Sequence, residues 1–132
     1  MGALMRLLLD TCVFIWLTQE PDRLSAPARK SIEHAGNELL VSHVSIWEIY
    51  LKGQSGKLKL PGKPDRWIKE QLAGWVITDL PIDLLSLHET NRLPDVHRDP
   101  FDRLLVSQAR IHELTLLTPD PWIQKYRVNW LW

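Results

Sequence analysis

The sequence predicts a doubly wound α/β domain, with a central, mostly parallel sheet and helices on both faces. Short apolar runs alternate with helical patterns along the chain, and the connections between them are brief. Such alternation is typical of strand–helix–strand units with right-handed crossovers. The chain has 132 residues, of which 45% are hydrophobic and 24% are charged, values typical of one globular domain. We therefore expect residues 1–132 to form a single domain around a five-stranded sheet.

Five short apolar runs, several of them rich in β-branched residues, have the composition of buried strands. They are residues 7–9, 39–42, 75–80, 114–118 and 127–132. Helical patterns lie between these runs. They comprise a first helix that carries Cys12, one from Ser25 to Gly36, one that opens at Ser45, one over residues 65–73, one from about Ile82 to before Pro94, and one from Pro100 to about His112. The two helices between the second and third strands could instead form a hairpin that projects from the sheet.

Three tryptophans lie in or beside the region between the second and third strands. They are Trp47, Trp67 and Trp75. Because large aromatic side chains dominate both cores and interfaces, we expect these three to pack in the core, and a partner-binding face is the alternative.

The charges of the chain exclude a strong overall attraction to nucleic acid. Sixteen Lys and Arg residues balance sixteen Asp and Glu residues, so there is no global positive field. Any contact with nucleic acid must be local. One candidate is a segment without acidic residues that holds Lys52, Lys57, Lys59 and Lys63, although such a segment can also be a solvated loop.

No feature of the sequence predicts export or a membrane span. No uncharged apolar run reaches the roughly 18 residues of a membrane helix, and the start lacks the pattern of an export signal. The single cysteine, Cys12, has no internal partner for a disulfide, which is typical of a reducing compartment. We expect a cytoplasmic protein without a membrane partner.

Acidic residues lie where the predicted strands end or the helices begin. Asp10 follows the first strand, Glu48 lies just past the second, and Asp120 follows the fourth. Asp99 and Asp102 stand at the start of the last long helix. Ligands of open parallel sheets bind at the carboxyl ends of the strands. We therefore expect these acids to converge on one site.

Most of these acids also have a local explanation as helix caps. Ser45 with Glu48 three residues later has the pattern of a capping box. Asp99 and Asp120 each precede a proline, as N-caps often do, and the acid at position 102 lies where the helix dipole favours a negative charge. Asp10 resists this explanation because capping does not require a buried strand before the cap.

A cluster of carboxylates needs a positive charge to offset it. Two carboxylates about 5 Å apart repel by about 3 kcal/mol at an effective dielectric of about 20. A divalent cation would neutralise such a cluster, and all-oxygen ligands select hard cations such as Mg²⁺. Ions of this kind support the hydrolysis of phosphodiesters. The sequence therefore predicts a metal-dependent phosphoryl-transfer site.

Other kinds of site lack their motifs. There is no GxxxxGK[ST] loop and no GxGxxG turn, and the five histidines show no HExxH or paired spacing for zinc. A phospho-accepting Asp10 would be expected to have a second acid two residues later, where Cys12 stands.

Five stretches, spread over the whole chain, carry a family resemblance. They are "LLLDTCVFIW", "VSHVSIWEI", "LPDVHRDPFDRLLVSQA", "LLTPD" and the closing "VNWLW". In these stretches the sequence resembles a PIN domain, specifically the VapC-type toxins of bacterial toxin–antitoxin pairs. The resemblance implies a mostly parallel five-stranded sheet and an endoribonuclease that depends on Mg²⁺ or Mn²⁺. It assigns the metal site and catalysis to Asp10, Glu48, Asp102 and Asp120.

The resemblance also implies how these acids divide their roles. Asp10, Asp102 and Asp120 would bind the metal, and Glu48 would bind a second ion or orient the attacking water. Asp102 takes the third place because it directly precedes the RLLVSQA helix face, which leaves Asp99 as the cap or an outer acid.

Further residues are expected to support the site. Thr11 and Thr118 match supporting positions of the family, with ordinary turn hydrogen bonds as the alternative. Arg98 and Arg103 flank the third acid and could contact phosphate, although Arg103 could instead pair with an acid on its own helix. His97 is equally compatible with a structural role and with substrate contact.

The implied partners are an RNA substrate, a cognate VapB-type antitoxin that blocks the site, and a second copy of the chain in a homodimer. The alternative function is a non-catalytic PIN-fold module for binding or regulation, in which the acids serve only as caps.

Overall fold

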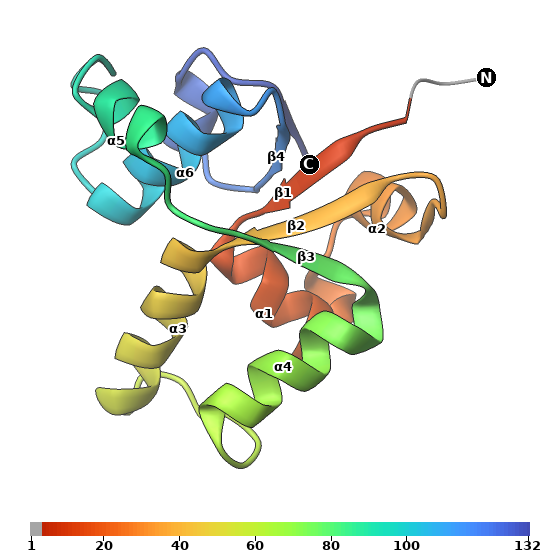
Figure 1. Cartoon of the computed structure of the whole chain (residues 1–132). Helices are drawn as coiled ribbons and strands as arrows, with labels where there is room; N and C mark the ends of the chain where they lie inside the picture. Colours follow the sequence, from red (N-terminus) through yellow and green to blue (C-terminus); the bar gives the residue numbers. More distant parts are fainter. Residues whose placement is uncertain (1–3) are drawn as a thin grey trace.

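Residues 4–132, which the computed structural model describes, form five strands and six α-helices around one sheet (Figure 1). The strands are β1 (Arg6–Leu9), β2 (Glu38–Ser42), β3 (Ile77–Leu80), β4 (Thr115–Leu117) and β5 (Trp130–Leu131). The helices are α1 (Thr11–Gln19), α2 (Ala26–Glu33), α3 (His43–Gln54), α4 (Pro64–Trp75), α5 (Leu84–Thr90) and α6 (Pro100–Ile111), with short 3₁₀ helices η1 (Pro21–Arg23) and η2 (Ile123–Lys125).

The sheet is parallel throughout its described strands, in the order β3-β2-β1-β4-β5. The centre of the sheet is thus formed by β2, β1 and β4. The carboxyl ends of all five strands lie at one edge. This confirms the predicted α/β class with a five-stranded sheet. The predicted domain also included residues 1–3, which lie outside the described part of the chain.

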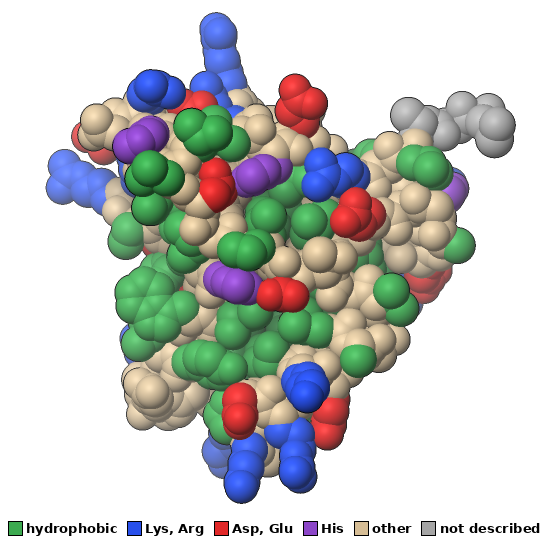
Figure 2. Space-filling view, viewed as in Figure 1, with side chains coloured by type: hydrophobic (Ala, Val, Ile, Leu, Met, Phe, Trp, Pro, Cys, Tyr) green, Lys and Arg blue, Asp and Glu red, His purple; other side chains and the backbone are tan. Residues whose placement is uncertain are grey.

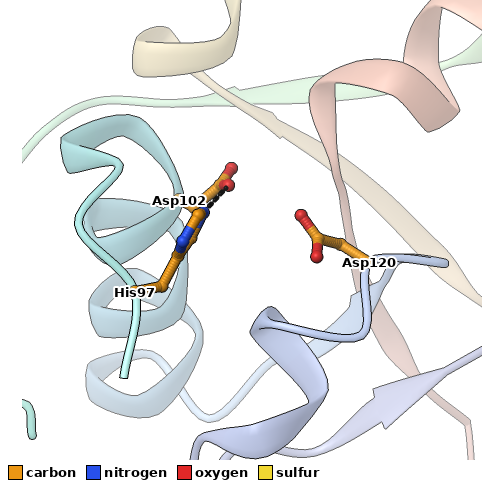
Figure 3. A group of neighbouring side chains, drawn as sticks. All are labelled: His97, Asp102 and Asp120. Carbon is orange, nitrogen blue, oxygen red and sulfur yellow. Dashed lines mark hydrogen bonds and ion pairs between the residues drawn. The ribbon is translucent and has the colours of Figure 1, made fainter. Parts of the chain in front are cut away.

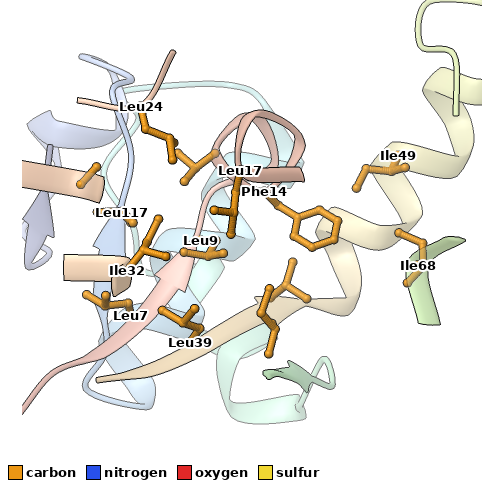
Figure 4. Close-up of a cluster of buried hydrophobic side chains, with 14 of the residues drawn as sticks. Leu7, Leu9, Phe14, Leu17, Leu24, Ile32, Leu39, Ile49, Ile68 and Leu117 are labelled. Carbon is orange, nitrogen blue, oxygen red and sulfur yellow. The ribbon is translucent and has the colours of Figure 1, made fainter. Parts of the chain in front are cut away.

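The central strand β1 is buried on both faces, which explains its run of leucines. Leu7 and Leu9 belong to one hydrophobic cluster together with side chains of α1, α2 and α4 (Figure 4). Leu8 points to the other cluster, which α6 and η2 complete. All three leucines are fully buried, and burial of each contributes roughly 1.5–3 kcal/mol. The strand before Asp10 is therefore held rigidly from both sides.

Two helix starts illustrate where local sequence signals hold and where they do not. Ser25 caps α2 as predicted, since its side chain accepts a hydrogen bond from the Ala28 N–H. The prediction that Ser45 opens the next helix is wrong, because α3 begins at His43 and Ser42 is its N-cap. Ser42 ends β2 and also donates to the buried side chain of Gln108, so a contact with α6 fixes the cap.

Several element boundaries differ from the predicted ones. The helix predicted from Ser25 to Gly36 ends earlier, at Glu33, and the helix predicted over residues 65–73 extends over the whole of α4. As a result β3 starts only at Ile77, after Val76 in the left-handed region at φ 55°. The predicted helix from Ile82 to before Pro94 is confined to α5, and the last two strands are shorter than residues 114–118 and 127–132.

The helices α3 and α4 connect β2 to β3 and lie on the same side of the sheet in Figure 1. They do not merely project from it, because Trp67 and Ile68 of α4 are buried in the first core cluster. Trp67 meets Phe14 edge to face, with ring centroids 6.0 Å apart. Core packing is thus correct for Trp67, whereas Trp47 and Trp75 are exposed. No helix in the described range combines the length and apolar character that crossing a membrane requires.

Candidate functional site

Asp10 lies at the carboxyl end of β1 and is 5% exposed. Its Oδ1 accepts a hydrogen bond of 2.7 Å from the Thr11 N–H, and its Oδ2 accepts one of 2.7 Å from the hydroxyl of Thr118. Asp10 is also the N-cap of α1, a role that the sequence did not indicate. Asp10 can be both a cap and a site residue. Its carboxylate is fixed from two segments that are distant in the sequence, by Thr11 and by Thr118.

Glu48 lies on α3 and is joined to the Asp10 region by Thr11. The Thr11 hydroxyl donates to Glu48 Oε1 at 2.7 Å and lies 2.9 Å from the hydroxyl of Ser45. Lys52, one turn later, lies 3.2 Å from Glu48 Oε2. The predicted capping box of Ser45 and Glu48 is therefore wrong, because both side chains point to Thr11 and neither caps the helix.

Asp102 lies in the first turn of α6, and Asp99 is the N-cap of that helix. The Asp99 carboxylate accepts a hydrogen bond of 2.9 Å from the Phe101 N–H and a weaker one of 3.4 Å from the Asp102 N–H. This matches the cap expected from the sequence. The Asp102 side chain is thereby left free for another role, and its Oδ2 lies 3.0 Å from His97 Nε2.

Asp120 lies in the turn after β4, and Thr118 links this turn to Asp10. The Asp120 N–H donates to Thr118 Oγ1 at 3.1 Å, and Asp120 Oδ1 accepts a hydrogen bond of 2.9 Å from the Trp122 N–H. The prediction that Asp120 repeats the N-cap arrangement of Asp99 is wrong. Only the short η2 follows, and its N-cap is Trp122.

The carboxylates lie close enough to perturb one another. Burial, and then the negative charges around it, raise the pKa of Asp102 to about 8, and those charges belong to Asp10, Asp99, Asp120 and Glu48. Burial also raises the pKa of Asp10, despite hydrogen bonds from Thr118 and Thr11 that lower it. Such mutual repulsion favours the protonated forms in the absence of a cation. Asp102 and the four acids around it thus form one electrostatic unit.

Three of the side chains here could hold a metal ion together. Ligand atoms of His97, Asp102 and Asp120 all lie within 4.8 Å of one another, and Figure 3 shows the two carboxylates directed into the space between α6 and the turn after β4. Carboxylate oxygens are the preferred ligands of Mg²⁺ and Mn²⁺. A divalent cation would also relieve the repulsion that raises the pKa of Asp102. Two of the predicted ligands, Asp102 and Asp120, therefore fit the predicted metal, and the third group close to them is His97.

The two arginines that flank Asp102 differ in their surroundings. The guanidinium of Arg103 donates to the hydroxyl of Tyr126 and to four backbone carbonyls, those of Thr90, Leu93, Pro94 and His97, at 2.9–3.3 Å. These hydrogen bonds from Arg103 hold the chain before α6 in place. The predicted alternative, in which Arg103 pairs with an acid of its own helix, is therefore wrong. Arg98 is exposed and lines an apolar groove with Trp47 and Phe101.

The basic segment predicted from the sequence is exposed near the site. In Figure 2, Lys and Arg side chains gather at the end of the molecule formed by the connection between α3 and α4. Lys57, Lys59 and Lys63 are exposed there. Lys52 and Lys57 line a groove with Glu48 and Asp99, so this segment adjoins the acids. Contact with nucleic acid remains a prediction.

The fold brings together residues of all four acidic stretches singled out in the sequence. Their roles as metal ligands and catalysts remain predictions. Sequence reasoning missed the contact of Ser45 with Thr11 and the position of Trp122 beside Asp120. The first has no local signal, since it depends on the packing of α1 against α3. The second has one, because an Asp side chain commonly accepts a hydrogen bond from the backbone N–H two residues later in a turn. His97, left open by the sequence, lies against Asp102.

Comparison with known sequences gives one family and one close relative. Residues 7–128 match the family model of the PIN domain. The chain is 32% identical over 120 residues to ribonuclease VapC22 of Mycobacterium tuberculosis, and the match covers 91% of each protein.

Comparison with solved structures gives the same fold at low sequence identity. VapBC2 from Rickettsia felis, bound to a DNA fragment from its promoter, has a TM-score of 0.71 at 12% identity, with 96% of this chain and 98% of that chain covered. DNA-bound VapBC from Salmonella typhimurium has a TM-score of 0.70 at 12% identity, with 97% and 98% covered. FitAcB from Neisseria gonorrhoeae has a TM-score of 0.58 at 22% identity, with 95% and 96% covered.

Proposed function

Because this chain belongs to the PIN domain family, we propose that it is a metal-dependent endoribonuclease and the toxin of a toxin–antitoxin pair. Its relative VapC22 is named as a ribonuclease. The single observation that carries the proposal is the convergence of carboxylates from separate segments around Asp102, where burial and then these negative charges raise the pKa of Asp102 to about 8. Helix capping alone gives no reason to gather like charges at this cost.

The proposed ligands of Mg²⁺ or Mn²⁺ are Asp10, Asp102 and Asp120, with Glu48 at a second ion or at the attacking water. When bound, the cation supplies charge stabilisation and lowers the pKa of a water molecule that attacks the phosphodiester. Thr118 holds Asp10 through its hydroxyl, and it holds the backbone of Asp120 through the same oxygen. These contacts keep two carboxylates in fixed positions, as a metal site requires.

The second supporting residue is Thr11, which fixes Glu48 relative to Asp10. Its N–H binds Asp10 and its hydroxyl binds Glu48, so one residue orients both acids. The ammonium of Lys52 lies 3.2 Å from the other carboxylate oxygen of Glu48. Thr11 and Lys52 thus hold the Glu48 carboxylate from both of its oxygens.

The products distinguish this mechanism from cleavage by the ribose. Attack by water leaves a 5′-phosphate and a 3′-hydroxyl, whereas attack by the 2′-hydroxyl leaves a cyclic phosphate and a 5′-hydroxyl. We expect the first pair of products, because the site gathers acids suited to a cation, and a bound cation would activate water as the attacking group.

A cleavage assay tests the proposed activity. Labelled single-stranded RNA should be cut in the presence of Mn²⁺, and EDTA or the Asp10→Asn substitution should abolish cutting. The matched control is Asp65→Asn, which changes an exposed acid in the first turn of α4 and should cut normally. Cutting that survives both EDTA and Asp10→Asn would refute the mechanism.

The alternative is a non-catalytic module with the same fold. Thermal melts separate the two, because a metal that binds only the folded state raises the melting temperature with concentration. We expect Mn²⁺ to raise it for the wild type and to have little effect on Asp10→Asn. If the acids serve only as caps, Mn²⁺ will act equally on both.

We also propose a cytoplasmic VapB-type antitoxin as a partner that blocks the site, and a homodimer as the assembled form. Support comes from the VapBC complexes among the structures of the same fold and from apolar side chains of α5, Leu84, Leu85 and Leu87, that are 45–65% exposed, as at many interfaces. The test is co-purification of the chain with the product of a small adjacent reading frame, followed by measurement of the mass of each species.

A further inference from the structure

Trp122 is a half-exposed aromatic residue attached to the acid cluster. Its side chain is 48% exposed, and its N–H donates to Asp120 Oδ1 at 2.9 Å. The same turn that positions the Asp120 carboxylate therefore positions the indole. None of the roles proposed above for the acids, threonines and lysine uses this side chain.

The surroundings of Trp122 are aromatic and cationic. The ring of His97 lies nearly parallel to the indole, at an angle of 10° and a centroid distance of 5.9 Å. His97 is itself 3.0 Å from Asp102, so the two rings are each tied to one acid of the site. The ammonium of Lys125 lies over the indole, 4.2 Å from its centroid.

An exposed tryptophan by itself needs no explanation, because isolated apolar side chains are common on protein surfaces. Trp75 provides the comparison, since it is 41% exposed at the end of α4. Trp122 differs from Trp75 in three contacts. Its backbone N–H donates to the carboxylate of Asp120, the ring of His97 lies nearly parallel to its indole, and the ammonium of Lys125 lies over the indole. A flat π surface next to a positive charge matches the two parts of a nucleotide, the base and the phosphate.

We propose that Trp122 is a stacking platform for one nucleobase of single-stranded RNA bound at the acid cluster, and that Lys125 moves from the indole to an adjacent phosphate. This inference rests on the proposed function and names a substrate-contacting residue for it. Stacking is tolerant of sequence because every base has a π face. Trp122 therefore contributes to the affinity for unpaired RNA at one base position without reading the identity of that base.

Stacking on an aromatic side chain has a measurable size. Removal of such a ring weakens binding by about 5- to 140-fold for each base. The Trp122→Ala substitution should therefore raise KM by about this factor, with a smaller change in kcat, because the acids are left in place. Trp122→Phe keeps a π surface and should restore most of the affinity.

The test compares RNA with and without bases. Binding of fluorescein-labelled oligoadenylate, and of an abasic ribose–phosphate oligomer of the same length, is measured in the Asp10→Asn background, so that the probe stays intact. The variants are Trp122→Ala, Trp122→Phe and Lys125→Gln, and Trp75→Ala is the matched control. Thermal melts confirm that each variant is folded, and KM and kcat are measured for the same substitutions in the otherwise wild-type chain.

We expect Trp122→Ala to weaken binding of oligoadenylate and to leave the abasic oligomer nearly unaffected, whereas Lys125→Gln weakens both. Equal losses for the two probes with Trp122→Ala, or losses matched by Trp75→Ala, would overturn the inference. Failure of the proposed function looks different. If the wild type cuts no RNA but Trp122→Ala shows the base-dependent loss of binding, the proposed catalysis is refuted and the proposed stacking is supported. If the wild type cuts RNA and Trp122→Ala leaves KM unchanged, only the proposed stacking is refuted.

Discussion

Replacement of Asp102 by asparagine should make the metal-free protein more stable at neutral pH. The pKa of this carboxyl is about 8 in the folded state, against an ordinary value of 3.8. The folded state therefore holds a proton that the unfolded state releases, and the free energy of unfolding falls as pH rises. The fall is up to about 1.4 kcal/mol per pH unit. It begins near pH 4, ends near pH 8, and amounts to at most about 4 kcal/mol at pH 7.

Asparagine has nearly the same shape as aspartate but does not titrate, so the part of this pH dependence that comes from Asp102 should disappear in the variant, which leaves the part that comes from the raised pKa of Asp10. Thermal melts in EDTA measure it, because 1 kcal/mol shifts the melting temperature of a domain of this length by roughly 4 °C. The wild type should lose stability steadily between about pH 5 and about pH 8, and Asp102→Asn should lose much less. With Mn²⁺ the order should reverse, since only the wild type offers the full set of carboxylates.

The matched control is Asp65→Asn. Asp65 also follows a proline in the first turn of a helix, but it is exposed and lies away from the acid cluster. Loss of its interaction with the helix dipole should lower stability by about 0.3–1 kcal/mol. If Asp102→Asn behaves like Asp65→Asn in EDTA, or if both variants keep the pH dependence of the wild type, the carboxylates do not repel one another as described.

The remaining predictions concern residues that support the site. Thr118→Val removes the hydroxyl that binds Asp10 and should weaken the affinity for Mn²⁺ by about 10- to 100-fold, measured from melting temperatures across a metal titration; an unchanged affinity would refute its supporting role. Arg103→Lys should lower the free energy of unfolding by about 2 kcal/mol or more in urea melts, because lysine cannot reach five acceptors, and metal affinity should stay the same. Ser42→Ala should cost about 2 kcal/mol or more, because it removes both the cap of α3 and the hydrogen bond to buried Gln108, whereas a neutral result would show that neither contact stabilises the fold.

Local signals in the sequence determined those features that depend on neighbouring residues. Three leucines before Asp10 predict a strand buried on both faces with a carboxylate at its end, and the structure has this arrangement. Ser25 and Asp99 cap the helices that follow them, because a cap bonds to backbone groups only two or three residues away. The alternation of strands and helices was sufficient to predict the α/β class, because it is also a pattern of neighbouring residues.

The tertiary structure alone decided which groups meet across segments. The cap of α3 is Ser42 and not Ser45, because Ser42 also bonds to Gln108 of a distant helix. Thr11 joins Asp10 to Glu48 only because β2 lies beside β1. Arg103 is held by carbonyls of the chain before α6. Hydrogen bonds between distant segments depend on the order of strands in the sheet, and no pattern of neighbouring residues encodes that order.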